Sequence, residues 1–169
     1  MTQNNVFKCN CPLARVTEVI GEPWTLMVLR EAFLGTRHFN AFERELGIAR
    51  NVLSVRLKKL VDLDLLDRVR SESDKRVVEY RLTDASRDLL PVLVGLAQWS
   101  GKWLCDGRSA TRFIERETGR EIPRIAVRGM DGRELEAREV AMAPGPDADP
   151  DLFARFERAA AVAADVPRG

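Results

Sequence analysis

The segment from residue 39 to residue 83 constrains the fold more than any other part of this 169-residue chain. Its first part has helical spacing, and Asn40 and Glu43 stand three residues apart, as in a reciprocal helix-capping pair. Gly47 then ends the helix, because a residue without Cβ turns cheaply at a helix C-terminus. A second helix is predicted from Arg50 onward. Its buried stripe consists of Leu53, Leu57 and Leu60.

The other face of this second helix is polar and basic. The side chains expected on it are Arg50, Asn51, Ser54, Val55, Lys58 and Lys59. A helix that packs on one side and offers donors and cations on the other suits the major groove of DNA. Two β-rich runs, 67–70 and 77–82, then flank a polar turn and predict a hairpin. Helix, turn, helix and hairpin in this order predict a winged helix-turn-helix.

The tip of the predicted hairpin carries Lys75 and Arg76. Both suit contact with phosphates or with an adjacent minor groove. The alternative is that they belong to a solvated hairpin tip that contacts nothing. Composition leaves both interpretations open.

Three further helices are predicted in the first 104 residues. Residues 12–22 and 24–34 have helical apolar spacing, and the second run is apolar enough to form the centre of the core. Thr83 could cap a long helix that reaches Leu104, with a kink or a restart at Pro91. This helix holds more apolar residues than a small domain needs, so we expect a partner, most simply a second copy. The expected dimer residues are Leu93, Leu96, Trp99 and Trp103.

The C-terminal third has a different character. Residues 111–114 and 122–127 are predicted as strands of a hairpin, a further strand is expected near Arg133, and a linker leads to a helix over 151–164. The predicted fold class is α+β and mainly helical, with a winged helix-turn-helix domain, a long dimerisation helix and a C-terminal β-hairpin extension. The predicted domains are 1–108 for DNA binding and dimerisation, 109–142 for the β extension, and 143–169 for the linker and terminal helix.

Charge and composition narrow the functional classes. The net charge is only +1, but residues 50–82 hold nine basic against six acidic side chains, while residues 109–169 hold ten against twelve. The argument for DNA binding therefore depends on where the cations lie. No apolar run approaches the roughly 20 residues of a membrane span, and the N-terminus lacks a secretion signal, so we expect a cytoplasmic protein without membrane contact. Neither a phosphate loop nor a nucleophile elbow is present, which argues against an enzyme, and we expect no cofactor.

Short motifs spread over residues 11–104 match one known family in order and spacing. They are Cys11-Pro12-Leu13, Ile20-Gly21-Glu22-Pro23-Trp24-Thr25-Leu26, Leu29-Arg30-Glu31, Arg37-His38-Phe39-Asn40-Ala41-Phe42, Leu53-Ser54-Val55-Arg56-Leu57-Lys58-Lys59-Leu60, Val78-Glu79-Tyr80-Arg81-Leu82-Thr83 and Leu89-Leu90-Pro91-Val92-Leu93. Together they resemble the HxlR-type winged-helix transcriptional regulators of bacteria. The resemblance implies a homodimer that binds a double-stranded DNA operator and represses or activates a nearby gene. It places the recognition helix at 50–62 and the wing at 67–82.

The chain departs from the family pattern in three places. Ala49 stands where members often have Ser or Thr ahead of the recognition helix, so a side-chain cap there is expected to be absent or supplied otherwise. Ser86 stands where many members have glycine. Some relatives carry paired cysteines in the C-terminal extension that suggest a small metal site. Residues 111–140 contain none, so a metal-free hairpin is expected.

Within the recognition helix, the residues near the N-terminus are the candidates for reading bases. Arginine reads guanine and asparagine reads adenine, and a valine can touch a thymine methyl, which is the role expected of Val55. The expected base-reading residues are Arg50, Asn51 and Ser54. Phosphate contacts set register without reading sequence. They are expected from Arg56, Lys58 and Lys59, with an ion pair inside the domain as an equal alternative for Arg56.

The candidate residues for redox control are the two N-terminal cysteines, Cys9 and Cys11. The sensor cysteine of thiol-sensing family members stands at the position of Cys11, near a helix N-terminus that would stabilise a thiolate. Cys9 could then act as the resolving thiol. The alternative is that Cys11 is only a small buried apolar residue. A metal site fits less well, because His38 and Cys105 complete no ligand set.

The functional prediction is therefore a homodimeric DNA-binding transcriptional regulator, most simply a repressor. Its control is expected to come from thiol oxidation or from a small-molecule effector bound beside the dimer helices. The alternative function is a winged-helix module for protein–protein contact without sequence-specific DNA binding. The basic face of the recognition helix favours DNA, because a protein-binding module has no need for it.

Overall fold

The computed structural model describes residues 10–71 and 74–164, which divide into two compact units. Of these residues, 23–126 form the winged-helix unit, while 10–22 and 127–164 together form the terminal unit. The division of the chain at residues 108 and 142 stays a prediction.

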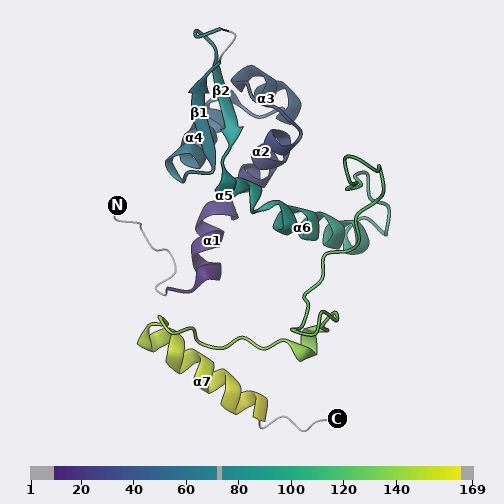
Figure 1. The fold of residues 1–169 in the computed structure, drawn as a ribbon. Coiled ribbons are helices and arrows are strands. Elements are labelled where there is room, and N and C mark those ends of the chain that lie inside the picture. Colours follow the sequence, from purple (N-terminus) through teal and green to yellow (C-terminus); the bar gives the residue numbers. More distant parts are fainter. Residues whose placement is uncertain (1–9, 72–73, 165–169) are drawn as a thin grey trace. The chain divides into compact units, whose positions relative to one another are not determined.

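The winged-helix unit contains a helix-turn-helix followed by a β-hairpin (Figure 1). Its elements are α2 (Pro23–Phe33), α3 (Phe39–Leu46), α4 (Arg50–Asp62), β1 (Leu66–Arg70), β2 (Val78–Leu82), α5 (Asp84–Arg87) and α6 (Leu90–Trp103). Strands β1 and β2 pair antiparallel, with Arg68 opposite Tyr80. The predicted fold class, mainly helical α+β with a winged helix-turn-helix, is confirmed.

The core of this unit lies between α2, α3, α4 and the hairpin. Val28 and Leu29 of α2 and Phe42 of α3 are completely buried, and the ring of Phe42 meets Tyr80 edge-on at a centroid distance of 6.4 Å. The stripe predicted on α4 is confirmed, since its three members are buried. These are Leu53, Leu57 and Leu60. Burying each such side chain contributes about 1.5–3 kcal/mol, so the inner face of α4 fixes where its outer face points.

The turn between α3 and α4 follows the sequence prediction in its glycine and departs from it in its cap. Gly47 has φ +60°, and its N–H donates to the carbonyl of Glu43, as expected for a helix C-cap. The predicted capping pair of Asn40 and Glu43 is wrong. The extended residue that precedes α3 is His38, which makes no side-chain cap, so Asn40 already lies inside the helix. Ala49 precedes α4 without a side-chain cap, as predicted.

The helix after the wing is interrupted and begins again near Pro91, as predicted. The side chain of Thr83 accepts a hydrogen bond from the Ser86 N–H at 3.2 Å and caps α5, a single turn. Helix α6 then begins at Leu90 with Pro91 in its first turn, where a missing N–H costs nothing. Ser86 is fully buried, and its hydroxyl donates to the Thr83 carbonyl at 2.9 Å. These bonds give Ser86 a local structural role at the start of α5.

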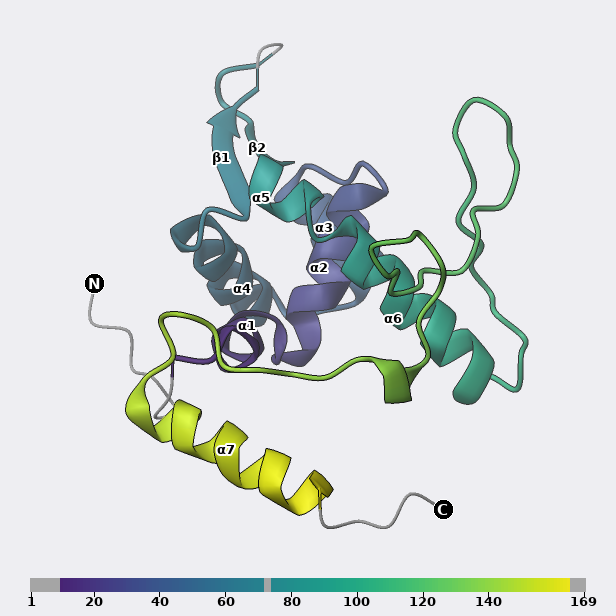
Figure 2. The same ribbon diagram turned by 60° about the horizontal axis from the view of Figure 1, so that its bottom comes forward.

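Residues 104–126 run out from the C-terminal end of α6 and return beside it (Figure 2). The side chain of Gln98 joins the two, donating to the Pro123 carbonyl at 3.2 Å and accepting from the Ile125 N–H at 2.8 Å. A turn over 116–118 joins the two runs predicted as strands, 111–114 and 122–127, but these strands shrink to one bridge, Ile114 to Glu121. A hairpin without an apolar face covered by other residues is marginally stable, and Ile114 is exposed.

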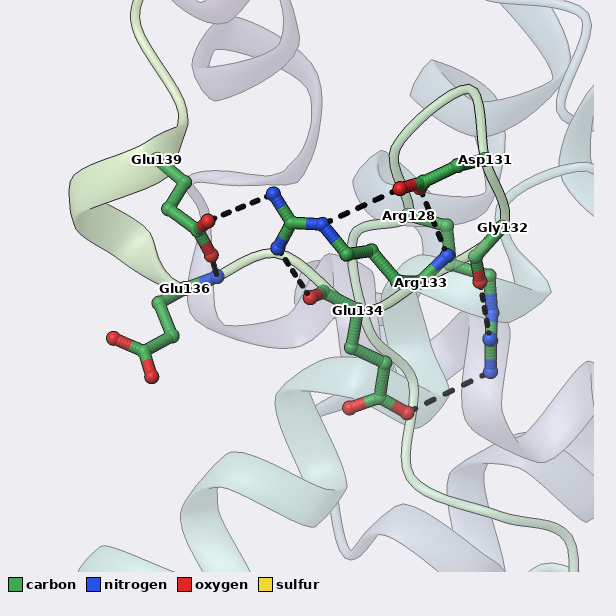
Figure 3. A network of polar contacts seen from close by, with 7 residues as sticks. All are labelled: Arg128, Asp131, Gly132, Arg133, Glu134, Glu136 and Glu139. Atoms are coloured by element: carbon green, nitrogen blue, oxygen red, sulfur yellow. Dashed lines mark hydrogen bonds and ion pairs between the residues drawn. The ribbon is translucent and has the colours of Figure 1, made fainter.

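The terminal unit contains α1 (Pro12–Ile20), a short 3₁₀ helix η1 (Ala137–Glu139) and α7 (Pro150–Ala164). The predicted strand near Arg133 is likewise a single bridge, Arg128 to Glu134. Arg133 organises this turn by pairing with Glu139 at 2.8 Å and Asp131 at 3.4 Å (Figure 3). The Arg133 guanidinium, followed by the Glu136 N–H, lowers the pKa of Glu139.

Helix α7 starts at the predicted place, because Asp149 caps it by accepting from the Leu152 N–H at 2.8 Å. The same carboxylate accepts from the Asn10 N–H at 2.9 Å, and the Asp149 N–H donates back to the Asn10 side chain at 3.2 Å. We call the pair of Asn10 and Asp149 the terminal clasp. The Leu152 N–H, and after it the Asn10 N–H, lower the pKa of Asp149.

Candidate nucleic-acid interface

The outward face of α4 collects most of the residues predicted to read DNA. Asn51, Ser54 and Val55 are exposed, with Val55 63% exposed although it is apolar. Arg50 and Lys58 flank them, and their side chains are 67% and 76% exposed. Because the opposite face of α4 packs against the core, these five side chains lie together on one exposed helical surface. We call this surface the α4 outer face.

Arg50 is held against α3 rather than extended into solvent. Its guanidinium donates to Glu43 at 2.9 Å and approaches the amide oxygen of Asn40 at 3.5 Å. The guanidinium carbon also lies 4.7 Å from the centre of the Phe39 ring. The pair that sequence analysis assigned to capping therefore holds an arginine of the neighbouring helix. An exposed pair of this kind is weak, about 0–1 kcal/mol, so DNA can displace it.

The three residues predicted to bind phosphates differ in their surroundings. Lys58 is exposed and pairs with Asp62 one helical turn later at 2.5 Å. Lys59 is half-buried. Arg56 is only 8% exposed, on the same side of α4 as the leucine stripe. This burial favours the structural alternative for Arg56 over a phosphate contact.

The hairpin places more cations on the surface than sequence analysis selected. Lys75 and Arg76 are exposed at its tip, where the Asp74 side chain accepts from the Arg76 N–H at 2.9 Å. Two arginines of β1, Arg68 and Arg70, are exposed as well and were missed. They alternate with Val69 along the strand, so the period-two pattern of residues 67–70 carried the signal.

Glu79, which stands opposite Val69 in the wing, connects β2 to the loop before α3. Its carboxylate is bonded by Arg81 at 3.0 Å and lies 4.0 Å from Arg37 and 3.9 Å from His38. The hydroxyl of Ser71 and the guanidinium of Arg81 hold the pKa of Glu79 below its usual value of 4.5. The Tyr80 N–H also donates to the Arg37 carbonyl at 2.7 Å. The wing is therefore connected to the helix-turn-helix by side chains as well as by backbone.

Helix α6 exposes a continuous apolar stripe. Val92, Leu96, Trp99 and Trp103 recur at helical spacing, and the two tryptophans are 55% and 64% exposed. Leu96, Trp99 and Trp103 were predicted dimer residues. Leu93 is half-buried, and Val92 occupies the place in the stripe that sequence analysis gave to Leu93. The spacing of 92, 96, 99 and 103 was the signal that could have found it.

The cysteines lie apart from the α4 outer face in sequence. Cys11 is half-buried and directly precedes α1, and its carbonyl accepts from the Arg15 N–H at 3.1 Å. Cys105 is exposed after α6. Cys9 lies outside the described residues.

Within residues 10–71 and 74–164, no three His, Cys, Asp or Glu side chains are placed to hold a metal ion. Over the same ranges no helix combines the length and apolarity needed to cross a bilayer.

A buried helix-turn-helix with a polar recognition helix and an adjoining β-hairpin defines the winged-helix class of DNA-binding proteins. Comparison with known proteins narrows this class. A family model described as HxlR-like helix-turn-helix matches residues 19–108. The chain thus belongs to the HxlR-like helix-turn-helix family and is a transcriptional regulator of the winged-helix type.

Individual relatives agree with this assignment. The uncharacterized HTH-type transcriptional regulator MT3179 of Mycobacterium tuberculosis (strain CDC 1551 / Oshkosh) is 43% identical over 136 residues, which are 79% of this chain and 85% of the relative. The crystal structure of PA1607 matches with a TM-score of 0.75 and 38% identity, covering 80% of this chain and 96% of PA1607. The redox regulator HypR in its oxidized form matches with a TM-score of 0.50 and 26% identity, covering 54% of this chain and 96% of HypR.

Proposed function

We propose that the protein is a homodimeric repressor that reads an operator with α4 and the β1–β2 wing. The α4 outer face carries this proposal, because it joins amide, hydroxyl, methyl and cationic groups on one exposed surface that the core does not use. Asn51 and Ser54 offer hydrogen bonds to base edges, and Val55 offers a contact to a thymine methyl. Arg50 reads a base after it leaves Glu43.

Phosphate contacts complete the proposed interface. Lys58 and Lys59 lie beyond the base-reading residues along α4, and the exposed wing cations offer a second set of contacts. The wing cations are Arg68, Arg70, Lys75 and Arg76. Arg56 supports α4 from inside rather than touching DNA. Because phosphate contacts release counterions, operator affinity is expected to fall steeply as salt increases.

The apolar stripe of α6 supports the dimer. Four large apolar side chains at consecutive helical turns are costly to leave in water, and a second copy can cover them through the same surface. Two recognition helices related by a two-fold axis would then contact half-sites of a pseudo-palindromic operator about 34–36 Å apart.

The test is binding of the purified protein to fragments of its own upstream region, measured by fluorescence anisotropy across a salt series. Tight, sequence-selective and salt-dependent binding supports the proposal, and a reporter gene that rises on deletion of the regulator supports repression. If operator and scrambled fragments bind equally at every salt concentration, the protein-interaction module becomes the better description. A fall of the reporter on deletion makes the protein an activator.

Control by thiol oxidation is a second part of the proposal, favoured by the position of Cys11. Its half-buried side chain directly precedes α1, and HypR is a redox regulator of similar fold. Diamide is expected to weaken operator binding by the wild type and to leave Cys11→Ser unaffected. The matched control is Cys105→Ser, which keeps the response. An equal response in wild type and Cys11→Ser removes Cys11 from the mechanism.

A further inference from the structure

A pocket of about 370 Å³ lies between the second half of α6 and the segment that returns beside it. The chain reverses after α6 through Asp106 and Gly107, both with positive φ, and the Gly107 N–H donates to the Gly101 carbonyl at 3.0 Å. Gly101 has no side chain to fill the space. A Cβ there would lie 3.1 Å from the Cβ of Ser109, so the glycine lets the returning segment approach.

The return of the chain is held by further bonds, which give the pocket fixed walls. The Ser109 hydroxyl donates to the Thr111 carbonyl at 2.7 Å, and Gln98 binds the backbone of Pro123 and Ile125. The volume lies within the range of about 300–1,000 Å³ that small-molecule sites occupy. The pocket is therefore large enough for one or two aromatic rings.

The lining of the pocket selects for charge. Lys102, Arg112 and Arg124 contribute three cations, against one acid, Glu121. Arg112 has neither an ion pair nor a hydrogen bond to any residue in the described part of the chain. A guanidinium offers a planar pair of donors that fits a carboxylate. Glu121 disfavours a doubly charged group such as a phosphate monoester, so a single negative charge suits the lining best.

The remaining lining residues indicate that the ligand has an apolar part besides its charged group. Phe113, Ile122 and Ala97 present apolar surface in the same pocket as the cations. An aromatic side chain beside arginines suits a flat ring that carries an acid group. A fully polar anion would leave this apolar surface wet and gain little from it.

We propose that this pocket binds a small aromatic carboxylate. Its wall includes Gln98, Gly101 and Lys102 of α6, and the same two turns carry Trp99 and Trp103 on the exposed stripe. The Lys102 ammonium lies 4.6 Å from the centre of the Trp103 ring. A ligand that draws Lys102 into the pocket would therefore remove this contact and alter the surroundings of Trp103 on the exposed stripe. Only this regulatory consequence rests on the proposed dimeric DNA-binding function. The binding site stands by itself.

The experiment is isothermal titration calorimetry on the full chain without DNA, with benzoate and 2-naphthoate as probes and the matching neutral amides as controls. Arg112→Gln removes one guanidinium from the pocket. Arg116→Gln removes an exposed arginine of the same segment that does not line the pocket, so it is the matched control. Both positions are exposed, so neither change should affect folding.

At least one acid is expected to bind tenfold or more tightly than its amide, and Arg112→Gln should lose most of this difference while Arg116→Gln keeps it. Absence of binding by both acids up to millimolar concentration overturns the proposal. Equal affinity for acid and amide, or equal losses in the two variants, overturns it as well. Because no DNA is present, failure of the operator experiment leaves this result unchanged, and the reverse also holds.

Discussion

Helices α4 and α6 have almost the same length, 13 and 14 residues, yet they use their surfaces in opposite ways. Helix α4 buries three leucines and shows polar and cationic groups to solvent. Helix α6 buries only Val94 and Gly101 and shows a stripe of valine, leucine and tryptophan. The first helix is complete within one copy of the chain and offers its outer face to a polyanion. The second leaves an apolar face exposed, which the proposed dimer would cover.

The largest expected effect comes from placing a charge in the α6 stripe. Trp99→Asp should give a monomer, because a carboxylate buried in an apolar interface is strongly unfavourable. Operator affinity should fall by about 10²- to 10⁴-fold, since two linked recognition helices become one. Sedimentation and anisotropy measure the two effects. Leu34→Asp, at another exposed apolar position, is the control, and an unchanged dimer in Trp99→Asp would show that this face is not the interface.

The second largest effect is expected from a substitution on the inner face of α4. Leu57→Ala is expected to lower the free energy of unfolding by about 2–5 kcal/mol, because it leaves a cavity in the core. Val55→Ala shortens an exposed side chain of the same helix and should change the free energy of unfolding by less than about 0.5 kcal/mol. Urea unfolding of both variants makes the comparison. Similar losses in the two would mean that the faces of α4 are assigned wrongly.

The outer face of α4 should affect recognition rather than stability. Arg50→Ala is expected to cost about 1–3 kcal/mol on the operator and little on random DNA, because a base contact is lost. Lys58→Ala should weaken both DNAs equally and reduce the salt slope by about one, as a phosphate contact does. Anisotropy titrations at several salt concentrations separate the two. Equal loss on both DNAs in Arg50→Ala would make that residue another phosphate contact.

The smallest effect concerns Glu79, which connects the wing to the loop before α3. Its pKa is lowered in the folded state, so the unfolded chain binds more protons, and the stabilisation is present above pH 4.5 and lost as pH falls below it. The unfolding free energy of Glu79→Gln should therefore depend less on pH in this acidic range than that of the wild type. Parallel unfolding curves of the two proteins down the pH series would contradict this role.

Much of the winged-helix unit could be predicted because its signals are local or periodic. The leucine stripe of α4, the glycine turn and the restart at Pro91 each follow from one residue type at one spacing. What could not be predicted depends on contacts between elements. Asn40 and Glu43 have capping spacing, but the chain enters α3 two residues earlier, and both side chains instead meet Arg50 of the next helix.

Burial and strand length were harder to predict for the same reason. Arg56 stands three residues after Leu53 and four before Leu60, so its spacing indicates the buried side of α4, whereas its charge favours exposure, and the packing decides for burial. The extension around Ile114 has strand-like composition, but strands extend only where a neighbouring layer covers them. The outward arginines of β1 and the place of Val92 in the α6 stripe were readable from spacing, so these were oversights rather than limits of the sequence.

The terminal clasp has a consequence for how the chain can be cut or extended. Asn10 and Asp149 are 139 positions apart, yet two hydrogen bonds join them, and Cys11 is the residue after Asn10. The residue that precedes this thiol is thus held by a residue near the far end of the chain. A protein shortened before Asp149 would keep its recognition helix and wing while changing the surroundings of Cys11. The proposed oxidation test of Cys11 therefore requires the full chain.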